Sequence, residues 1–309
     1  MDITEIAGAL GQCFKGSLEP GKSLADLTSF RIGGPAGLIA TPKGFEDLKL
    51  ITQEIASSGI ELLVLGRGSN VLISDKGFPG VVLVLGEGFN RIKRQGQDKV
   101  NVEAGCELNR LVAWTIERDL VGLESLAGIP GSLGGAVRMN AGAQGCSIGD
   151  SVEEISVLRL DGREVRDGEI AAERIGFAYR KTGLEDNEII YKVKLKLSGK
   201  GTNDLEARRK DVLRRRRENQ PLAQPSAGSV FRNPEGISAG ELIDRCGLKG
   251  KSVGGAMVSE KHANFIVNIG GATARDVYEL MTLIKQEVRR REGVELIEEI
   301  RLVGDMGGG

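Results

Sequence analysis

Three glycine-rich loops hold most of the residues whose types and spacing could bind a cofactor. The longest is Gly128–Gly142 (GIPGSLGGAVRMNAG), and two shorter loops lie upstream, at Arg31–Gly37 (RIGGPAG) and Gly66–Asn70 (GRGSN). Glycine allows a positive φ and lets the backbone approach a ligand without a Cβ between them. Because runs of backbone N–H groups bind phosphates, we expect one large cofactor held mainly by the backbone. The alternative is that the loops are tight turns of a compact sheet protein.

Other residues narrow the chemistry. GRGSN lacks the Gly-Lys-Ser/Thr ending of a P-loop, and no loop combines GxGxxG with a properly spaced acidic residue. The chain has one histidine, His262, so Ser-His-Asp or Cys-His catalysis would have to pass through that single residue, which disfavours both. We therefore expect Ser, Tyr, Lys or a carboxylate to transfer protons, and His262 to serve packing or hydrogen bonding.

Composition indicates a soluble cytoplasmic protein. The 309 residues carry a net charge of −1 and are 40% apolar and 28% charged. We expect no signal peptide, no membrane association, no nucleic-acid partner and no obligate protein partner. The four cysteines are far apart and form no CxxC pair, so we expect neither a metal site nor disulfides. Cys106 and Cys246 lie in apolar surroundings and are expected to be buried.

The elements that must position these loops alternate between strands and helices. Apolar spacing predicts a helix from Phe45 to a stop at Gly59 and another over Leu108–Ile116. Short apolar runs predict strands at Glu61–Leu65, Val71–Ile73, Val81–Leu85 and Val100–Ala104. This rhythm is typical of a mixed α/β architecture.

The second half of the chain has a different pattern. Val152–Leu160 followed by Asp161-Gly162 predicts a hairpin, and Tyr191–Leu197 alternates as a half-buried strand. Ser198–Asn203 is the best linker candidate, and a basic helix over Asp204–Glu218 follows it. Further predictions are a short helix between the Ser238 capping box and Gly247, a strand with Phe265, Val267 and Ile269 on one face, a helix from Val277 to Gly293, and a last strand over Val294–Val303.

The order of the motifs resembles that of the UDP-N-acetylenolpyruvoylglucosamine reductases. The motifs are GRGSN-VLI, GIPGSLGG-A-x-x-MNAGA, FAYR, PSAGSVFRNP, SEKHANFIVN and GVELIEEIRLVG, and they span about Ser29 to Gly304. The short stretch between Arg180 and Tyr191 resembles the subclass that lacks an extra tyrosine-bearing loop.

This resemblance implies an α+β flavoenzyme of peptidoglycan precursor synthesis, a process of cell-wall biogenesis, cell shape and cell division. Residues 1–200 would form an FAD-binding domain of the vanillyl-alcohol-oxidase type, with lobes of about 1–85 and 86–200, and residues 201–309 a substrate-binding domain. NADPH would reduce non-covalently bound FAD. Hydride would then pass to C3 of UDP-N-acetylglucosamine enolpyruvate, giving UDP-N-acetylmuramate.

Motif position assigns the roles that this reaction needs. Arg180 and Glu299 would stabilise the developing enolate, and Ser229 would deliver the proton to C2. Tyr179 and Asn233 would contact the substrate. FAD would be held by the residues of the glycine loops and by one arginine, namely Gly66, Gly68, Ser69, Asn70, Pro130, Gly131, Ser132, Gly134, Gly135, Asn140, Ala141, Gly142 and Arg301.

The chain departs from the family pattern at three places. Arg232 stands where FKNP has lysine, Glu298 precedes Glu299 in place of the family's LEPE, and Asn219 replaces a lysine that could contact the diphosphate. We choose Glu299 over Glu298 by its spacing from Arg301. Arg216 and Arg217 are further candidates for a diphosphate contact.

Two other functions stay open. One is a sugar or alcohol oxidase of the same FAD fold, although no His or Cys is placed for covalent flavin attachment. The other is a nucleotide- or nucleic-acid-binding protein without catalysis, which would use the glycine loops and the arginine run Arg214–Arg217.

Overall fold

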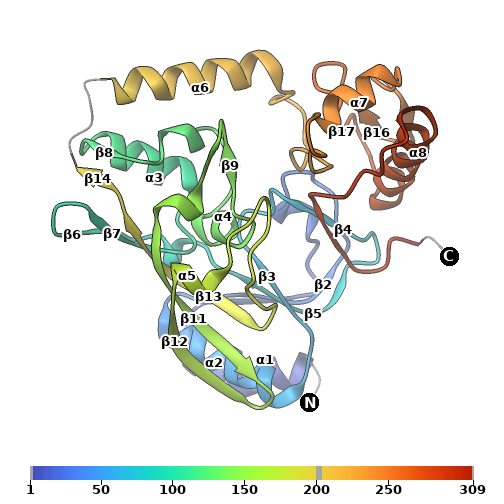
Figure 1. Cartoon of the computed structure of the whole chain (residues 1–309). Helices are drawn as coiled ribbons and strands as arrows, with labels where there is room; N and C mark the ends of the chain where they lie inside the picture. Colours follow the sequence, from blue (N-terminus) through green and yellow to red (C-terminus); the bar gives the residue numbers. More distant parts are fainter. Residues whose placement is uncertain (1–2, 200–203, 308–309) are drawn as a thin grey trace. The chain divides into compact units, whose positions relative to one another are not determined.

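The computed structural model describes residues 3–199 and 204–307 (Figure 1). The chain divides into two compact units. The first contains Met1–Gly21, Gly37–Arg67 and Pro79–Arg214, and the second contains Lys22–Ala36, Gly68–Phe78 and Arg215–Gly309. Each unit is therefore assembled from segments that lie far apart in the sequence.

A four-stranded sheet with the order β1-β2-β5-β3 begins the first unit. Its strands are β1 (Ser17–Pro20), β2 (Ala36–Thr41), β5 (Phe78–Val84) and β3 (Leu62–Leu65), and the helices α1 (Ile3–Leu10) and α2 (Phe45–Ser58) accompany it. Helix α2 forms as its apolar spacing predicts, since Leu48, Ile51 and Ile55 are buried. It ends at Gly59, whose φ of 69° lets its N–H donate to the Ile55 carbonyl.

A five-stranded antiparallel sheet with the order β12-β11-β13-β7-β6 completes the frame of this unit. The strands are β12 (Glu164–Ala171), β11 (Val152–Asp161), β13 (Glu188–Lys196), β7 (Lys99–Glu103) and β6 (Ile92–Gln95). Asp161 pairs with Glu164, so the predicted hairpin is confirmed, and Gly162 takes the positive φ in its turn. Smaller elements are α3 (Leu108–Ile116), β8 (Leu120–Val121), α4 (Leu133–Arg138), β9 (Gly142–Ala143), β10 (Cys146–Ser147), α5 (Ala172–Ile175) and β14 (Ser198–Gly199).

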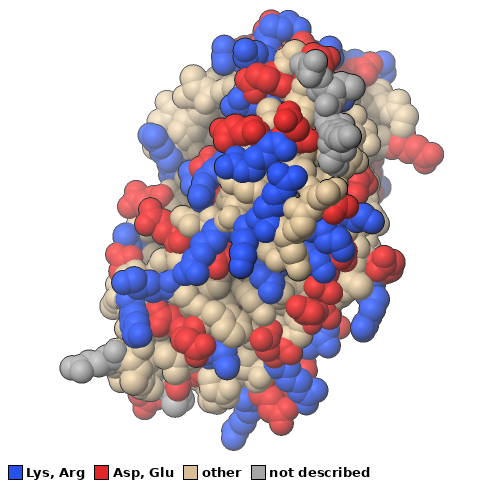
Figure 2. All heavy atoms as spheres, turned by 90° about the vertical axis from the view of Figure 1, so that its left-hand side faces the viewer, with Lys and Arg blue, Asp and Glu red and all other residues tan. Residues whose placement is uncertain are grey.

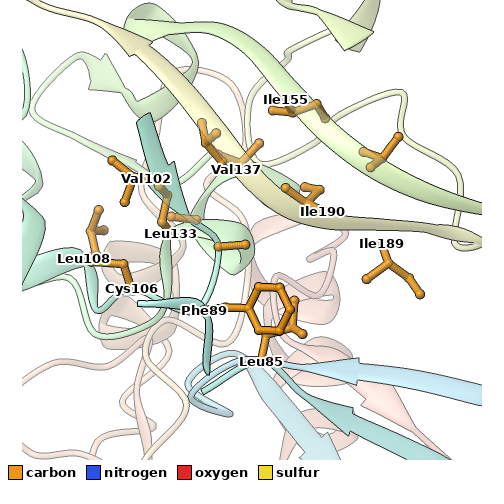
Figure 3. Close-up of a cluster of buried hydrophobic side chains, with 14 of the residues drawn as sticks. Leu85, Phe89, Val102, Cys106, Leu108, Leu133, Val137, Ile155, Ile189 and Ile190 are labelled. Carbon is orange, nitrogen blue, oxygen red and sulfur yellow. The ribbon is translucent and has the colours of Figure 1, made fainter. Parts of the chain in front are cut away.

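The core of the first unit joins α4 to this sheet. Figure 3 shows Leu133 and Val137 of α4 beside Val102, Ile155 and Ile190 of the strands. Cys106 belongs to the same cluster, as expected, and its burial raises the pKa of the thiol to about 11. Short helix α4, which begins at the longest glycine loop, is thus fixed on an apolar base.

The second unit packs two helices on a small sheet (Figure 1). The strands β15 (Ser252–Val253), β16 (Ala256–Val258) and β17 (Ile266–Asn268) are antiparallel, and the helices are α7 (Ala239–Arg245) and α8 (Ala274–Glu292). Helix α8 starts with a capping box at Thr273 and stops at Gly293. A separate parallel pair joins β4 (Val71–Ile73) to β18 (Arg301–Val303).

Two strand predictions need correction. Only Arg301–Val303 of the expected strand Val294–Val303 is a strand. The preceding residues meet their neighbour at one bridge, between Glu298 and Phe231, and the N–H groups of Glu299 and Ile300 share the Val230 carbonyl. The register holds up to Glu299, and this bulge ends the regular alternation beyond that residue. Ile269 is 50% exposed and lies beyond β17, whereas Ile266 and Val267 are both buried.

The predicted basic helix is present as α6 (Leu205–Asn219), which runs across the sequence boundary between the units. The first two residues of the predicted linker Ser198–Asn203 form strand β14, which pairs with β8, so they are not part of a linker. Positions 200 to 203 lie outside the described residues. The domain division at residue 200 stays a prediction. No helix in the described parts of the chain is long and apolar enough to span a bilayer.

Candidate active site

Two glycine loops meet in the first unit. A Cβ added to Gly66 would lie 2.1 Å from Ser132 Oγ and 3.1 Å from Ser132 Cβ, so only glycine fits this contact. Gly131 and Ser132 are buried, yet within the described residues the N–H groups of Gly66, Gly131 and Ser132 donate to no other group. Buried N–H groups are nearly always paired, so these donors fit an anionic ligand such as a dinucleotide diphosphate.

The N-terminus of α4 has a different role, because its donors are already used. The Leu133 N–H donates to the Cys106 carbonyl and the Gly134 N–H to the Ala104 carbonyl, both at 2.8 Å. Ser132 Oγ accepts the Gly135 N–H at 3.4 Å. A Cβ on Gly134 would lie 2.9 Å from Ala104 Cβ, so this glycine permits close packing of α4 on the chain after β7.

Asn140 ties the end of the long loop to its surroundings. It has a φ of 43°, and its side chain donates to the Ala178 carbonyl at 2.9 Å and accepts the Gly149 N–H at 3.1 Å. The next residue, Ala141, donates its N–H to the Ala136 carbonyl. These bonds give Asn140 a positioning function, and its contact with FAD stays a prediction.

Tyr179 and Arg180 occupy the tip of a tight turn. Ala178 and Lys181 exchange two backbone hydrogen bonds, of 2.9 and 3.2 Å, around them. Arg180 has a φ of 54°, which is unusual for a residue with a side chain, and it donates to the Gly142 carbonyl at 2.7 Å. Tyr179 is 53% exposed, and the guanidinium of Arg180 lies 5.2 Å from the centre of its ring.

The remainder of GRGSN belongs to the second unit. Gly68 is buried with a φ of 57°, and a Cβ there would lie 2.1 Å from the Leu27 carbonyl oxygen. Its carbonyl accepts the Ser29 N–H at 3.0 Å, which joins this loop to the residues just before RIGGPAG. Among the described residues no acceptor pairs with the N–H of Gly68 or of Asn70. Ser69 lies between them and is half-buried.

Backbone pairing brings Ser229 and Glu299 onto adjacent segments. The Glu299 N–H donates to the carbonyl of Val230 at 2.7 Å, one residue from Ser229. Asn70 reinforces this arrangement, since its side chain donates to the Glu299 carbonyl at 3.1 Å and its carbonyl accepts the Arg301 N–H at 3.0 Å. Ser229 and Glu299 are both half-buried.

The two adjacent glutamates have separate surroundings. Glu298 bridges Phe231 through the backbone, and its carboxylate pairs with Lys285 of α8 at 2.7 Å. Side chains alternate across such a pair, so Glu299 lies on the other face of the segment. The choice of Glu299 as the chemical residue therefore agrees with the pairing of Glu298, although its role stays a prediction.

One residue that the sequence gave no role organises the segment that carries Ser229. Asn264 is 3% exposed, accepts the Phe231 N–H at 3.0 Å and donates to the Phe231 carbonyl at 2.8 Å. Its own N–H donates to Nδ1 of His262 at 3.3 Å, and burial lowers the pKa of that histidine. His262 is thus the packing and hydrogen-bonding residue expected. The sequence signal for this role was a polar residue among the apolar residues of SEKHANFIVN.

Asn233 closes the same segment at its other end. Its side-chain oxygen accepts the N–H of Ala239 at 3.0 Å, which helps Ser238 to cap helix α7. The residue is exposed, as a substrate contact requires. Its contact with the substrate stays a prediction.

The arginines of α6 are interleaved with acidic residues. Arg209 pairs with Glu206 at 3.1 Å and Arg214 with Asp211 at 2.7 Å. Figure 2 shows Lys and Arg mixed with Asp and Glu on the face in view. Helical pairs three residues apart dilute the positive charge that a nucleic-acid site would need.

Comparisons with known proteins agree over almost the whole chain. A family model described as "UDP-N-acetylenolpyruvoylglucosamine reductase, C-terminal domain" matches residues 220–303, and one described as "FAD binding domain" matches residues 36–168. UDP-N-acetylenolpyruvoylglucosamine reductases of Heliobacterium modesticaldum and Pelobacter propionicus are 42% and 40% identical. Each alignment covers 96% of this chain, with 93% and 98% of the relative.

A solved structure extends the agreement to the fold. The crystal structure of UDP-N-acetylenolpyruvylglucosamine reductase from Thermus caldophilus superposes with a TM-score of 0.77 at 36% identity. It covers 94% of this chain and all of that chain, 100%. The expected α+β fold with an FAD-binding domain is confirmed.

Proposed function

The chain belongs to the UDP-N-acetylenolpyruvoylglucosamine reductase family, and from this premise we propose that it reduces UDP-N-acetylglucosamine enolpyruvate to UDP-N-acetylmuramate with NADPH. The observation that carries the proposal is the 42% identity along 96% of the chain. The reaction would serve peptidoglycan precursor synthesis in the cytoplasm. The subclass without the extra tyrosine loop and the substrate domain of residues 201–309 are parts of the same proposal.

FAD, when bound, supplies hydride to C3 of the enolpyruvyl group. We assign its diphosphate to the unused N–H donors of the glycine loops in the first unit, which are those of Gly66, Gly131 and Ser132. Gly68 and Asn70 stay predicted contacts of FAD. The close contact between Gly66 and Ser132 supports this assignment, because it places the unused donors of the two loops side by side. Gly134, Gly135, Asn140, Ala141 and Gly142 would shape that surface, and Pro130, Ser69 and Arg301 would contact the cofactor at its edges.

The chain's own residues manage charge and protons. Addition at C3 moves negative charge toward the substrate carboxylate, where the Arg180 guanidinium and a protonated Glu299 carboxyl would stabilise it. Ser229 Oγ would then give a proton to C2. Tyr179 and Asn233, both exposed, would bind the nucleotide sugar. NADPH and the substrate would use the same flavin face in turn.

Anaerobic stopped-flow absorbance of the purified holoprotein tests this proposal. NADPH should bleach the flavin, and UDP-N-acetylglucosamine enolpyruvate added next should restore the yellow colour. Ser229→Ala should leave the bleaching rate near wild type and slow the recovery at least about 100-fold. Recovery only after oxygen is admitted would instead indicate an oxidase, and a colourless protein that FAD cannot reconstitute would indicate a non-catalytic binder.

A further inference from the structure

Arg232 is a cation without a counter-ion beside the residues assigned to the reaction. It is half-buried, and its Nε atom is buried with no hydrogen-bond partner among the described residues. No carboxylate in the described parts of the chain forms an ion pair with its guanidinium. A buried donor left unpaired costs free energy, so a missing partner is expected at this position.

The backbone shows which face of the segment carries Arg232. Its N–H donates to the Ile297 carbonyl at 2.8 Å, which places these two residues opposite each other. Phe231 and Glu298 form the neighbouring pair, and the Glu298 carboxylate points to Lys285 of α8. Because side chains alternate along paired segments, Arg232 shares the face of Ile297, which is 60% exposed.

Glu299 follows on that same face, diagonally across from Arg232. Asn233, assigned to substrate binding, is the next residue in the chain, and Ser229 precedes Arg232 by three positions. Arg232 therefore shares its face of the segment with Glu299, and among the described residues its guanidinium has no acidic partner. An anionic group of a ligand would supply the missing hydrogen-bond acceptor for this guanidinium.

We propose that Arg232 binds an oxyanion of the sugar-nucleotide substrate through its guanidinium. The inference rests on the proposed function, because it takes the substrate class from it. Two groups of such a substrate have suitable chemistry, namely the diphosphate and the carboxylate of the enolpyruvyl group. A guanidinium presents a planar fork of N–H donors that matches either oxyanion with two hydrogen bonds.

Equilibrium titration of the FAD-loaded full chain with three ligands tests the proposal. UDP carries the diphosphate, UDP-N-acetylglucosamine adds the sugar, and UDP-N-acetylmuramate adds a carboxylate. Arg232→Met should weaken binding about 10- to 100-fold for every ligand that carries the recognised oxyanion. Equal losses for all three ligands would identify the diphosphate, and a loss confined to UDP-N-acetylmuramate would identify the carboxylate.

Arg289→Met is the matched control, since Arg289 is an exposed arginine on α8 of the same unit and should leave all three affinities within twofold. Arg232→Lys keeps the charge but loses the fork, so it should weaken binding at least about threefold, and it replaces Arg232→Met if that variant does not fold. Affinities within twofold of wild type for the folded Arg232 variant would overturn the inference. Failure of the wild-type protein to bind any of the three ligands would instead reject the proposed function.

Discussion

Replacing Gly66 by alanine tests whether two glycine loops of the first unit form one cradle. The new Cβ would lie 2.1 Å from Ser132 Oγ and 3.1 Å from Ser132 Cβ. Rotation of the hydroxyl relieves the first contact but gives up the cap on the Gly135 N–H, which costs about 0.5–1 kcal/mol. The contact between the two Cβ atoms adds about 1–2 kcal/mol of overpacking. We therefore expect Gly66→Ala to lower the free energy of unfolding by about 2 kcal/mol.

Two measurements follow this change. The melting temperature should fall by about 4–8 °C, from the usual relation between free energy and melting temperature for a unit of this size. Titration of the apoprotein with FAD should show about tenfold weaker binding, because displacement of the Gly66 N–H removes one hydrogen bond to a charged group. Gly168→Ala is the matched control, since a Cβ there meets nothing within 4 Å.

A second substitution separates this clash from a general effect of alanine. Ser132→Gly removes both atoms that the new Cβ would meet, so in that background Gly66→Ala should cost less than about 1 kcal/mol. Full additivity of the two changes would refute the reasoning. A single variant with unchanged melting temperature and unchanged FAD affinity would refute it equally.

Three further predictions concern charges and thiols. Glu299→Gln should lower turnover at least about 100-fold in a steady-state assay. Glu298→Gln should keep turnover near wild type and slightly lower the melting temperature, because it loses the ion pair with Lys285. The reverse ranking of the two turnover rates would assign the catalytic role to Glu298. The hydrogen bond from Arg290 lowers the pKa of Glu287 to about 2. The loss of unfolding free energy caused by Glu287→Gln at pH 7 should therefore diminish as pH falls from about 4.5 toward 2. Urea denaturation of both proteins at several pH values measures this loss, and a loss that does not change with pH would contradict the prediction. A thiol reagent should label exposed Cys13 and Cys146 in the native protein and reach Cys106 and Cys246 only after denaturation, and rapid native labelling of all four would contradict the fold.

Elements with strong local signals were predictable from the sequence. Helix α2 has apolar residues at helical spacing and a glycine at its end, and α8 has a capping box and the same kind of stop. The hairpin of β11 and β12 has the typical turn residues Asp161-Gly162 between its strands. In each case the signal and the structure it determines lie within one short segment, so long-range contacts only reinforce it.

Features that depend on distant segments were not predictable in this way. Alternating apolar residues over Val294–Val303 indicated one strand, but the strand requires a partner, and β4 reaches only Arg301–Val303. Likewise, the Val71–Ile73 strand belongs to the same compact unit as Arg301, more than two hundred positions away in the chain by numbering. Local periodicity contains no information about which segment supplies a strand's partner.

Arg180 was also unpredictable as a turn residue, because its backbone conformation is one that arginine rarely adopts. Arg180 occupies a φ of 54°, where glycine or asparagine would fit the turn with less strain. Two backbone bonds between Ala178 and Lys181 and the bond from Arg180 to the Gly142 carbonyl hold this conformation. Strain of about 1–3 kcal/mol is retained where a side chain is needed at a fixed position. These contacts hold the Arg180 guanidinium at a fixed position, which is what its proposed charge stabilisation at the enolate would require.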